Sequence, residues 1–180
     1  MDRDDRGSSA MAYWLFKSEP DCFSFDDLMA SPERSTGWDG IRNYQARNFL
    51  RDQVRRGDLV LYYHSNAKPP GIAGIAEVVR EAHPDPTAFD PEADHYDPKS
   101  DPDDPTWFQV TIRAVRPIDP PLDLPRLRAE PRLDGLELLR KGSRLSIQPV
   151  GPEHWSVIEG LIADAAPGPK SKARTKLRPA

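Results

Sequence analysis

The stretch that most constrains the fold is a strand, a short polar loop and a second strand between residues 57 and 77, GDLVLYYHSNAKPPGIAGIAE. Residues 59–64 alternate between two faces and are rich in strand-forming side chains. The polar loop HSNAKPPG follows, and in the second strand Gly74 and neighbouring alanines leave one face bare. A bare face lets a ligand or a packed neighbour approach the backbone. We therefore expect this hairpin to form one wall of a pocket for a flat ligand.

Short elements of both kinds surround the hairpin. Further strands are predicted at 13–17, 107–115 and 144–150, where aromatic and β-branched residues alternate with others. Helices are predicted at 24–29, 44–55, 122–129 and 136–141, and from Pro152 onward. Because most strands are separated by helices, the order predicts an α+β fold. Its sheet is expected to be mixed or antiparallel and barrel-like, with five or more strands and flanking short helices.

The segment 83–105 is expected to be a long loop, because it contains six prolines and seven aspartates. We expect one domain at 12–162, with disordered extensions at 1–11 and 163–180. The chain carries a net charge of −4, divided into −1 before residue 12, −7 in the body and +4 after residue 163. A basic tail on an acidic body suits weak, salt-sensitive contact with nucleic acid, although such a tail more often serves only as a solubilising disordered end.

Several other classes of protein are disfavoured by the sequence. No apolar run approaches the roughly 18 residues of a membrane-spanning helix, so no membrane contact is expected. A single cysteine, Cys22, excludes an internal disulfide framework and suits a reducing compartment. We expect a cytoplasmic monomer, and the arginine- and proline-rich composition is typical of a bacterial protein.

An enzymatic interpretation has little to build on. Cys22 with His64 is the only thiol and base combination, and nothing in the sequence places the two together. The four histidines lack a paired metal-ligand spacing, and no glycine-rich phosphate loop is present. No metal and no cofactor are therefore expected.

A binding interpretation needs flat faces for stacking and hydrogen-bonding groups that converge on one place. Trp38 lies in a polar loop, Trp107 begins a strand, and polar residues follow Tyr63 at the end of another strand. Stacking on a nucleic-acid base contributes about 1–3 kcal/mol, and hydrogen bonds to the base edge add selectivity. Each residue also has a structural interpretation, since either tryptophan could fill the core and Asn43 could simply cap a helix.

Several long runs resemble one known family. They are YWLFKSEPD (13–21), WDGIRNYQARNFLR (38–51), GDLVLYYHSN (57–66), PGIAGIAEVVREAHPDPTAFDP (70–91), HYDPKS (95–100), WFQVTIRAV (107–115) and RLSIQPV (144–150). On these runs the chain resembles the EVE domain, of the PUA-like superfamily and related to YTH domains. The resemblance covers about residues 12–162 and implies a small mixed β-barrel flanked by helices.

The resemblance also implies a function, which is recognition of a modified base, a modified cytosine in DNA, in an aromatic pocket and without catalysis. The implied base-binding residues are Lys17, Ser18, Trp38, Asn43, Tyr63, His64, Ser65, Trp107, Ser146 and Gln148. The implied partner is nucleic acid carrying a modified base, DNA rather than RNA. Three alternatives stay open: a reader of modified RNA, a sensor of small nucleotides, and an enzyme that uses Cys22 or His64.

Overall fold

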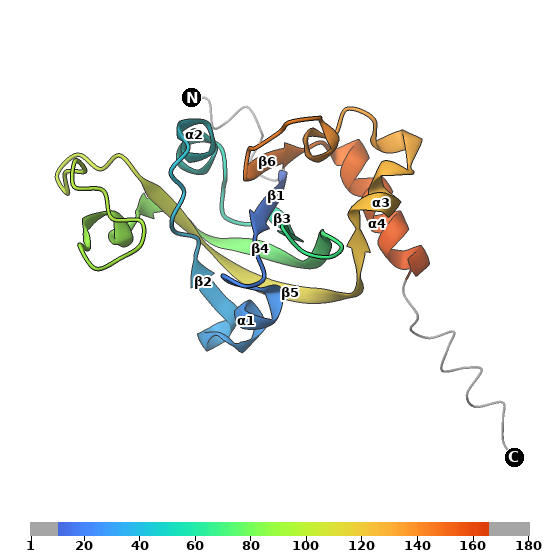
Figure 1. Cartoon of the computed structure of the whole chain (residues 1–180), viewed down its shortest axis with the longest axis horizontal. Coiled ribbons are helices and arrows are strands. Elements are labelled where there is room, and N and C mark those ends of the chain that lie inside the picture. Colours follow the sequence, from blue (N-terminus) through green and yellow to red (C-terminus); the bar gives the residue numbers. More distant parts are fainter. Residues whose placement is uncertain (1–10, 166–180) are drawn as a thin grey trace, which may run out of the picture.

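The computed structural model describes residues 11–165 and contains one mixed sheet of six strands (Figure 1). The strands are β1 (Tyr13–Ser18), β2 (Ser35–Gly37), β3 (Leu59–His64), β4 (Gly71–Pro84), β5 (Phe108–Asp123) and β6 (Ile147–Val150). Their order is β2-β5-β4-β3-β1-β6; β1 runs parallel to β3, and all other neighbours are antiparallel. The predicted mixed α+β fold is confirmed, but the sheet is open, with β2 and β6 at its two edges. Of the segments predicted to be disordered, 1–11 and 163–180, most lies outside the described residues, but 163–165 form the last residues of α4.

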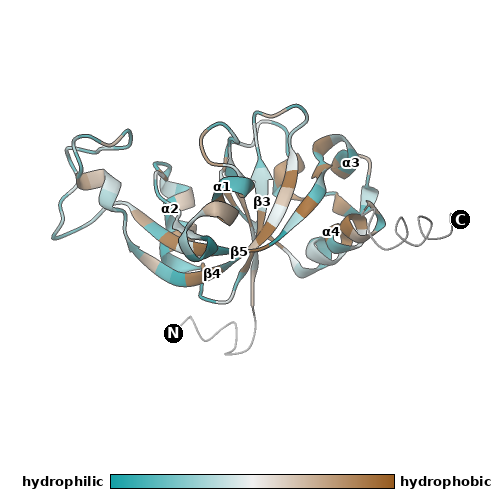
Figure 2. Ribbon diagram, turned by 90° about the horizontal axis from the view of Figure 1, so that it is seen from below, coloured by the Kyte–Doolittle hydropathy of each residue, from teal (hydrophilic) through white to brown (hydrophobic). Residues whose placement is uncertain are grey.

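Short helices cover the sheet. The α-helices are α1 (Phe25–Ala30), α2 (Tyr44–Asp52), α3 (Leu124–Arg128) and α4 (Pro152–Ala165). The 3-10 helices are η2 (Pro32–Arg34), η3 (Pro86–Phe89), η4 (Pro131–Leu133) and η5 (Glu137–Leu139). The predicted capping box begins α1, because the Ser24 hydroxyl accepts the Asp27 N–H and the Asp27 carboxylate accepts the Ser24 N–H. In Figures 1 and 2, α3 and α4 lie side by side at one end of the sheet, away from α1 and α2.

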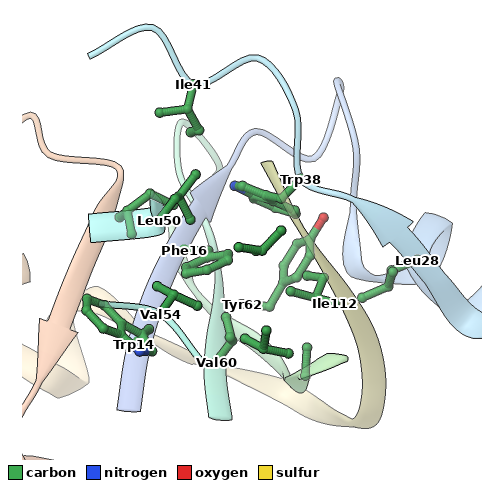
Figure 3. Close-up of a cluster of buried hydrophobic side chains, with 14 of the residues drawn as sticks. Trp14, Phe16, Leu28, Trp38, Ile41, Leu50, Val54, Val60, Tyr62 and Ile112 are labelled. Atoms are coloured by element: carbon green, nitrogen blue, oxygen red, sulfur yellow. The ribbon is translucent and has the colours of Figure 1, made fainter. Parts of the chain in front are cut away.

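Two hydrophobic clusters fill the two faces of the sheet. Successive side chains of a strand point to opposite faces, and along β1 this places Trp14 and Phe16 in one cluster and Leu15 in the other. The first cluster also contains Val60 and Tyr62 of β3 and lies under α1 and α2 (Figure 3). The second packs against α4 through residues such as Trp155, Ile158, Leu161 and Ile162. No helix between residues 11 and 165 is both long enough and apolar enough to cross a membrane.

The predicted hairpin is present as β3 and β4, with a break in register at Tyr62/Tyr63 that leaves Ala73 unpaired. The bare face at Gly74 is not open. A Cβ atom there would overlap the ring of Phe25, which is 2% exposed. Phe25 comes from α1 and stacks edge-on against Tyr62. A packed neighbour therefore occupies the space in which a ligand was expected.

Two other expectations needed correction. Helix α2 ends at Asp52 and not at Arg55, and β5 continues to Asp123, well past the predicted end at 115. The longer β5 pairs with β4 along most of its length, although it contains three prolines. Segment 83–105 is irregular apart from the end of β4 and η3. It projects beyond the sheet next to α2 (Figure 1).

Candidate functional site

A cavity of about 740 Å³ opens where several segments end on the same side of the sheet. We call it the Trp38 cavity. It is lined by Lys17, Ser18, Cys22, Phe23, Thr36, Gly37, Trp38, Asp39, Gly40, Ile41, Thr87, Ala93, Asp94, His95 and Ser146. These residues come from the end of β1, the loop after it, the end of β2, the 38–41 loop, η3 and the segment around residue 95, and the approach to β6. The cavity therefore depends on the tertiary fold and not on any one motif.

The end of β1 forms one wall. The Lys17 N–H donates to the Ser146 carbonyl at 3.0 Å, which joins this wall to the approach to β6. The Ser18 hydroxyl donates to the Phe23 carbonyl at 2.8 Å. That bond holds the following loop, including Cys22, against the strand. The side chain of Lys17 is half-buried, and burial lowers the pKa of its ammonium group, while the charge of Glu137 opposes this shift.

Trp38 serves both the core and the cavity. Its indole is 7% exposed and lies 5.4 Å from the ring of Phe16 and 5.3 Å from that of Tyr62, between ring centroids (Figure 3). Its backbone N–H donates to the Val110 carbonyl at 2.7 Å. The tryptophan is thus held rigidly while it contributes to the cavity lining. A fixed aromatic surface of this kind can stack a flat ligand at little cost in side-chain entropy.

A buried carboxylate, Asp85, joins the 38–41 loop to η3, and both segments line the cavity. Asp85 is fully buried and accepts the Gly40 N–H at 2.8 Å, Arg42 Nη1 at 3.0 Å and the Thr87 hydroxyl at 2.6 Å. Desolvation would raise the pKa of Asp85, but its hydrogen bonds to Thr87, Gly40 and Arg42 outweigh it and lower the pKa. The ionised side chain therefore fixes the 38–41 loop against η3.

His95 completes this side of the cavity. The Arg42 guanidinium donates to the His95 carbonyl through Nε at 3.1 Å and through Nη2 at 2.6 Å. Gly40 has φ = +81°, and a Cβ atom on it would lie 2.9 Å from the imidazole of His95. Glycine at this position therefore allows both the left-handed backbone and the close approach of the ring.

The cavity brings together four of the residues predicted as base-binding: Lys17, Ser18, Trp38 and Ser146. Two others lie nearby without lining it. The Asn43 side chain accepts the Ala46 N–H and caps α2. The Trp107 indole N–H donates to Asp97 at 2.7 Å, and the ring packs 4.9 Å from Tyr44.

The remaining predicted residues lie away from the cavity lining. Tyr63 is buried in the cluster beneath α4, where burial raises its pKa to about 12. The His64 Nε2 accepts the Phe25 N–H at 3.0 Å, and the Ser65 N–H donates to the Ser18 carbonyl. Gln148 is fully buried and donates to the Leu145 carbonyl at 2.8 Å. These contacts hold His64, Ser65 and the amide nitrogen of Gln148 within the packed structure, whereas Oε1 of Gln148 is buried without a hydrogen-bond donor among the described residues.

Sequence reasoning did not single out Asp39, Thr87 or His95 as ligand contacts, although all three line the cavity. Asp39 had a usable signal, because it directly follows the tryptophan that was predicted to stack a base. His95 and Thr87 had none, since they belong to a segment that the sequence indicated only as an irregular loop. Cys22 lines the cavity, but His64 is hydrogen-bonded to Phe25 outside its lining.

Residues 11–165 contain no group of three or more histidine, cysteine or acidic side chains arranged to hold a metal ion. Chemically, the cavity offers an aromatic face, an ammonium group, hydroxyl groups and carboxylates. That combination is suited to a flat polar ligand with donors and acceptors on its edge.

Comparison with known proteins identifies relatives. The family model for the EVE domain matches residues 12–161. Human thymocyte nuclear protein 1 is 40% identical over 167 residues, covering 83% of this chain and 73% of the human protein. A Pseudomonas putida protein structure is 48% identical with a TM-score of 0.80, covering 84% of this chain and 99% of that one.

A crystal structure of human thymocyte nuclear protein 1 (THYN1) in complex with 5-methylcytosine containing DNA is 40% identical in sequence to this chain and matches its structure with a TM-score of 0.79. The alignment covers 84% of this chain and 97% of the human one. The similarity thus extends over almost all of the described fold. The chain belongs to the EVE domain family.

Proposed function

We propose that this chain is a DNA-binding reader domain that holds one modified base, a modified cytosine, in the Trp38 cavity without altering it chemically. The observation that carries the proposal is the presence in one cavity of a rigid indole and of polar side chains from separate segments. The volume of about 740 Å³ lies within the range of ligand sites, about 300–1,000 Å³.

The energetics of base recognition fit such a site. Extruding a base from a duplex costs a few kcal/mol. Stacking on an aromatic side chain returns about 1–3 kcal/mol. In this proposal Trp38 supplies the stacking surface and Lys17 and Ser146 hydrogen-bond the edge of the base, which is supported by the presence of all three in the cavity lining. A base that leaves buried donors or acceptors unpaired is penalised, and this penalty provides selectivity.

A relative with a known partner supports DNA and a modified cytosine as the ligand. Human THYN1 has been crystallised with 5-methylcytosine containing DNA, and 40% of aligned residues are identical between the two chains. We propose the same class of ligand for this chain.

A phosphate-binding surface is needed in addition, because the chain as a whole is acidic. We assign it to the face near the N-terminus of α2. Arg47 lies 5.0 Å above the ring of Tyr44, which is 60% exposed. An arginine ordered on an exposed aromatic ring near the cavity can contact the backbone beside an extruded base.

The test is a titration of duplexes that differ only in one cytosine, methylated or not, with modified single-stranded RNA as a third ligand. Wild-type protein is expected to prefer the methylated duplex. Trp38→Ala should weaken that binding on the order of 5- to 150-fold, which corresponds to the loss of about 1–3 kcal/mol of stacking.

Because Trp38 also packs against Phe16 and Tyr62, Trp38→Phe serves as the fold-preserving variant and should lose only part of the affinity. Val115→Ala, at an exposed position on β5, is the control that should bind as wild type. The proposal would be contradicted if wild-type protein bound both duplexes with equal affinity and Trp38→Phe bound them with that same affinity. Tighter binding of the modified RNA than of the methylated duplex would indicate a reader of RNA in place of DNA.

A further inference from the structure

Two carboxylates that line the Trp38 cavity, Asp39 and Asp94, accept no hydrogen bond from the described residues, and Asp39 is the one beside the tryptophan in the chain. Asp39 directly follows Trp38, lines the cavity and is exposed there. Within residues 11–165, no side chain or backbone group donates a hydrogen bond to its carboxylate. Asp85, the nearby buried carboxylate, differs in this respect, since it is saturated by Gly40, Arg42 and Thr87.

We propose that Asp39 is the residue that determines base specificity, by accepting a hydrogen bond from the exocyclic amino group of the bound pyrimidine. The cavity would then select a 4-amino pyrimidine and reject its 4-oxo counterpart, so that 5-methylcytosine is bound in preference to thymine. This inference rests on the proposed function and names the ligand class of the same cavity.

The backbone that carries Asp39 is fixed on both sides. The Trp38 N–H donates to Val110 at 2.7 Å, and the Asp39 N–H donates to the Gly37 carbonyl at 3.1 Å. The Gly40 N–H is held by Asp85 at 2.8 Å. Three successive amides are thus anchored, so the carboxylate is presented from a rigid support next to the indole, which is the requirement for a group that reads a base edge.

The chemistry of the two bases explains the discrimination. Both carry the 5-methyl group and the 2-oxo group, and they differ only at position 4 and at N3. The cytosine amino group donates to a carboxylate, which is the usual way an acidic side chain reads this base. Thymine presents an oxygen at position 4, so two acceptors would face each other and one would stay unpaired in the cavity.

The electrostatic surroundings of Asp39 are compatible with this role. Desolvation raises the pKa of the carboxyl, the charge of Asp85 raises it further, and His95 and Arg42 oppose the shift. The ionised group can accept from the amino group. A protonated group can donate to N3 of cytosine while its second oxygen accepts from the amino group. Either form suits cytosine, but only the ionised form rejects thymine, because a protonated carboxyl group can donate to the 4-oxo group, so the proposed selectivity belongs to the ionised form.

Lys17 supplies the contrast within the same cavity. Its ammonium group can only donate, and the 2-oxo group of the ligand is common to cytosine and thymine. We therefore expect Lys17 to support the binding of both bases without discriminating between them.

The experiment measures the affinity for single positions occupied by 5-methylcytosine, cytosine or thymine, each opposite an abasic site so that no base pair has to be broken. Wild-type protein should bind 5-methylcytosine on the order of 5- to 150-fold more tightly than thymine, as a good base-edge contact predicts. Asp39→Asn should bring this ratio close to one, because an amide can both accept from the amino group and donate to the oxo group.

Glu159→Gln is the control, since it removes an exposed carboxylate on α4, outside the cavity lining, and should keep the wild-type ratio. Lys17→Met should lower both affinities and leave the ratio unchanged. Equal binding of thymine and 5-methylcytosine by wild type, or an unchanged ratio in Asp39→Asn, overturns the role of Asp39. In that case a retained preference for 5-methylcytosine over cytosine still supports the reader function. Absence of measurable binding to all three overturns both.

Discussion

At the scale of single residues, Gly74 shows how a position can be left small for packing. A Cβ atom at residue 74 would overlap the ring of Phe25, which is itself buried against Tyr62. Gly74→Ala is therefore expected to destabilise the protein by about 1–3 kcal/mol, the usual cost of overpacking. The measurement is the free energy of unfolding in urea.

Gly160 provides the matched control in α4, where an added Cβ atom meets nothing within 4 Å. Gly160→Ala should stabilise the protein by about 0.4–1 kcal/mol, because it restricts the unfolded chain at a position already helical. If the two substitutions changed stability equally, the ring of Phe25 could not be what fills the space above Gly74.

Gly74 also marks a limit of sequence-based prediction at this scale. The run of glycine and alanine indicated correctly that something approaches the strand closely. It could not indicate what approaches, because Phe25 reaches this position only through the capping box that begins α1 and the placement of α1 on the sheet. The glycine and alanine pattern indicated that the strand has free space above it, but only the tertiary structure shows that Phe25 fills this space.

At the scale of elements, one histidine joins the end of β3 to the start of α1. The neutral Nε2 of His64 accepts the Phe25 N–H at 3.0 Å. Burial lowers the pKa of His64, while the charges of Asp26 and Asp27 oppose the shift. A base whose pKa is lower in the folded state than in the unfolded state stabilises the fold at pH values above its unfolded pKa, which is about 6.5 for histidine. This stabilisation is lost as the pH falls through the folded-state pKa.

We therefore predict that wild-type protein loses stability between pH 7 and pH 5 and that His64→Gln loses less of it. Glutamine cannot gain a proton in this range but can still offer an acceptor to the Phe25 N–H. Urea unfolding at several pH values measures the difference. His154→Gln, on the surface of α4, should follow the wild-type profile. A His64→Gln profile parallel to wild type would argue against this link.

The lengths of elements were harder to predict than their existence. The sequence placed α1, α2, α4 and the hairpin correctly, because capping residues and alternation are local signals. It ended β5 at residue 115, where the alternation of aromatic and β-branched residues stops, and the prolines beyond it are unfavourable in a strand because each lacks an N–H donor. The strand nevertheless continues, since the neighbouring long strand β4 offers partners as far as Asp123, with Pro117 opposite Gly74. Pairing with a distant segment overrode the local rule.

At the scale of the whole molecule, the Trp38 cavity is a product of strand order. Placing β1 between β3 and β6 brings Lys17 and Ser146 together, and the link from Asp85 to Gly40 adds the opposite wall. The sequence showed which strand ends carry polar residues, but not which ends converge. For that reason it grouped Tyr63 and Gln148 with Trp38, although both are buried in the packed interior.

The distribution of charge leads to a prediction for the entire chain. Residues 166–180 contain five basic residues and no acidic one, so removing them takes the net charge from −4 to −9. Binding to any DNA should weaken, and the slope of log affinity against log salt should become shallower by about 0.9 for every phosphate that the tail neutralises. The ratio of the affinities for 5-methylcytosine and cytosine should not change, because phosphate contacts carry no base information.

A full-length variant with the five basic residues replaced by glutamine separates the effect of charge from that of chain length. If that variant kept the wild-type salt slope, the tail could not be contacting phosphates.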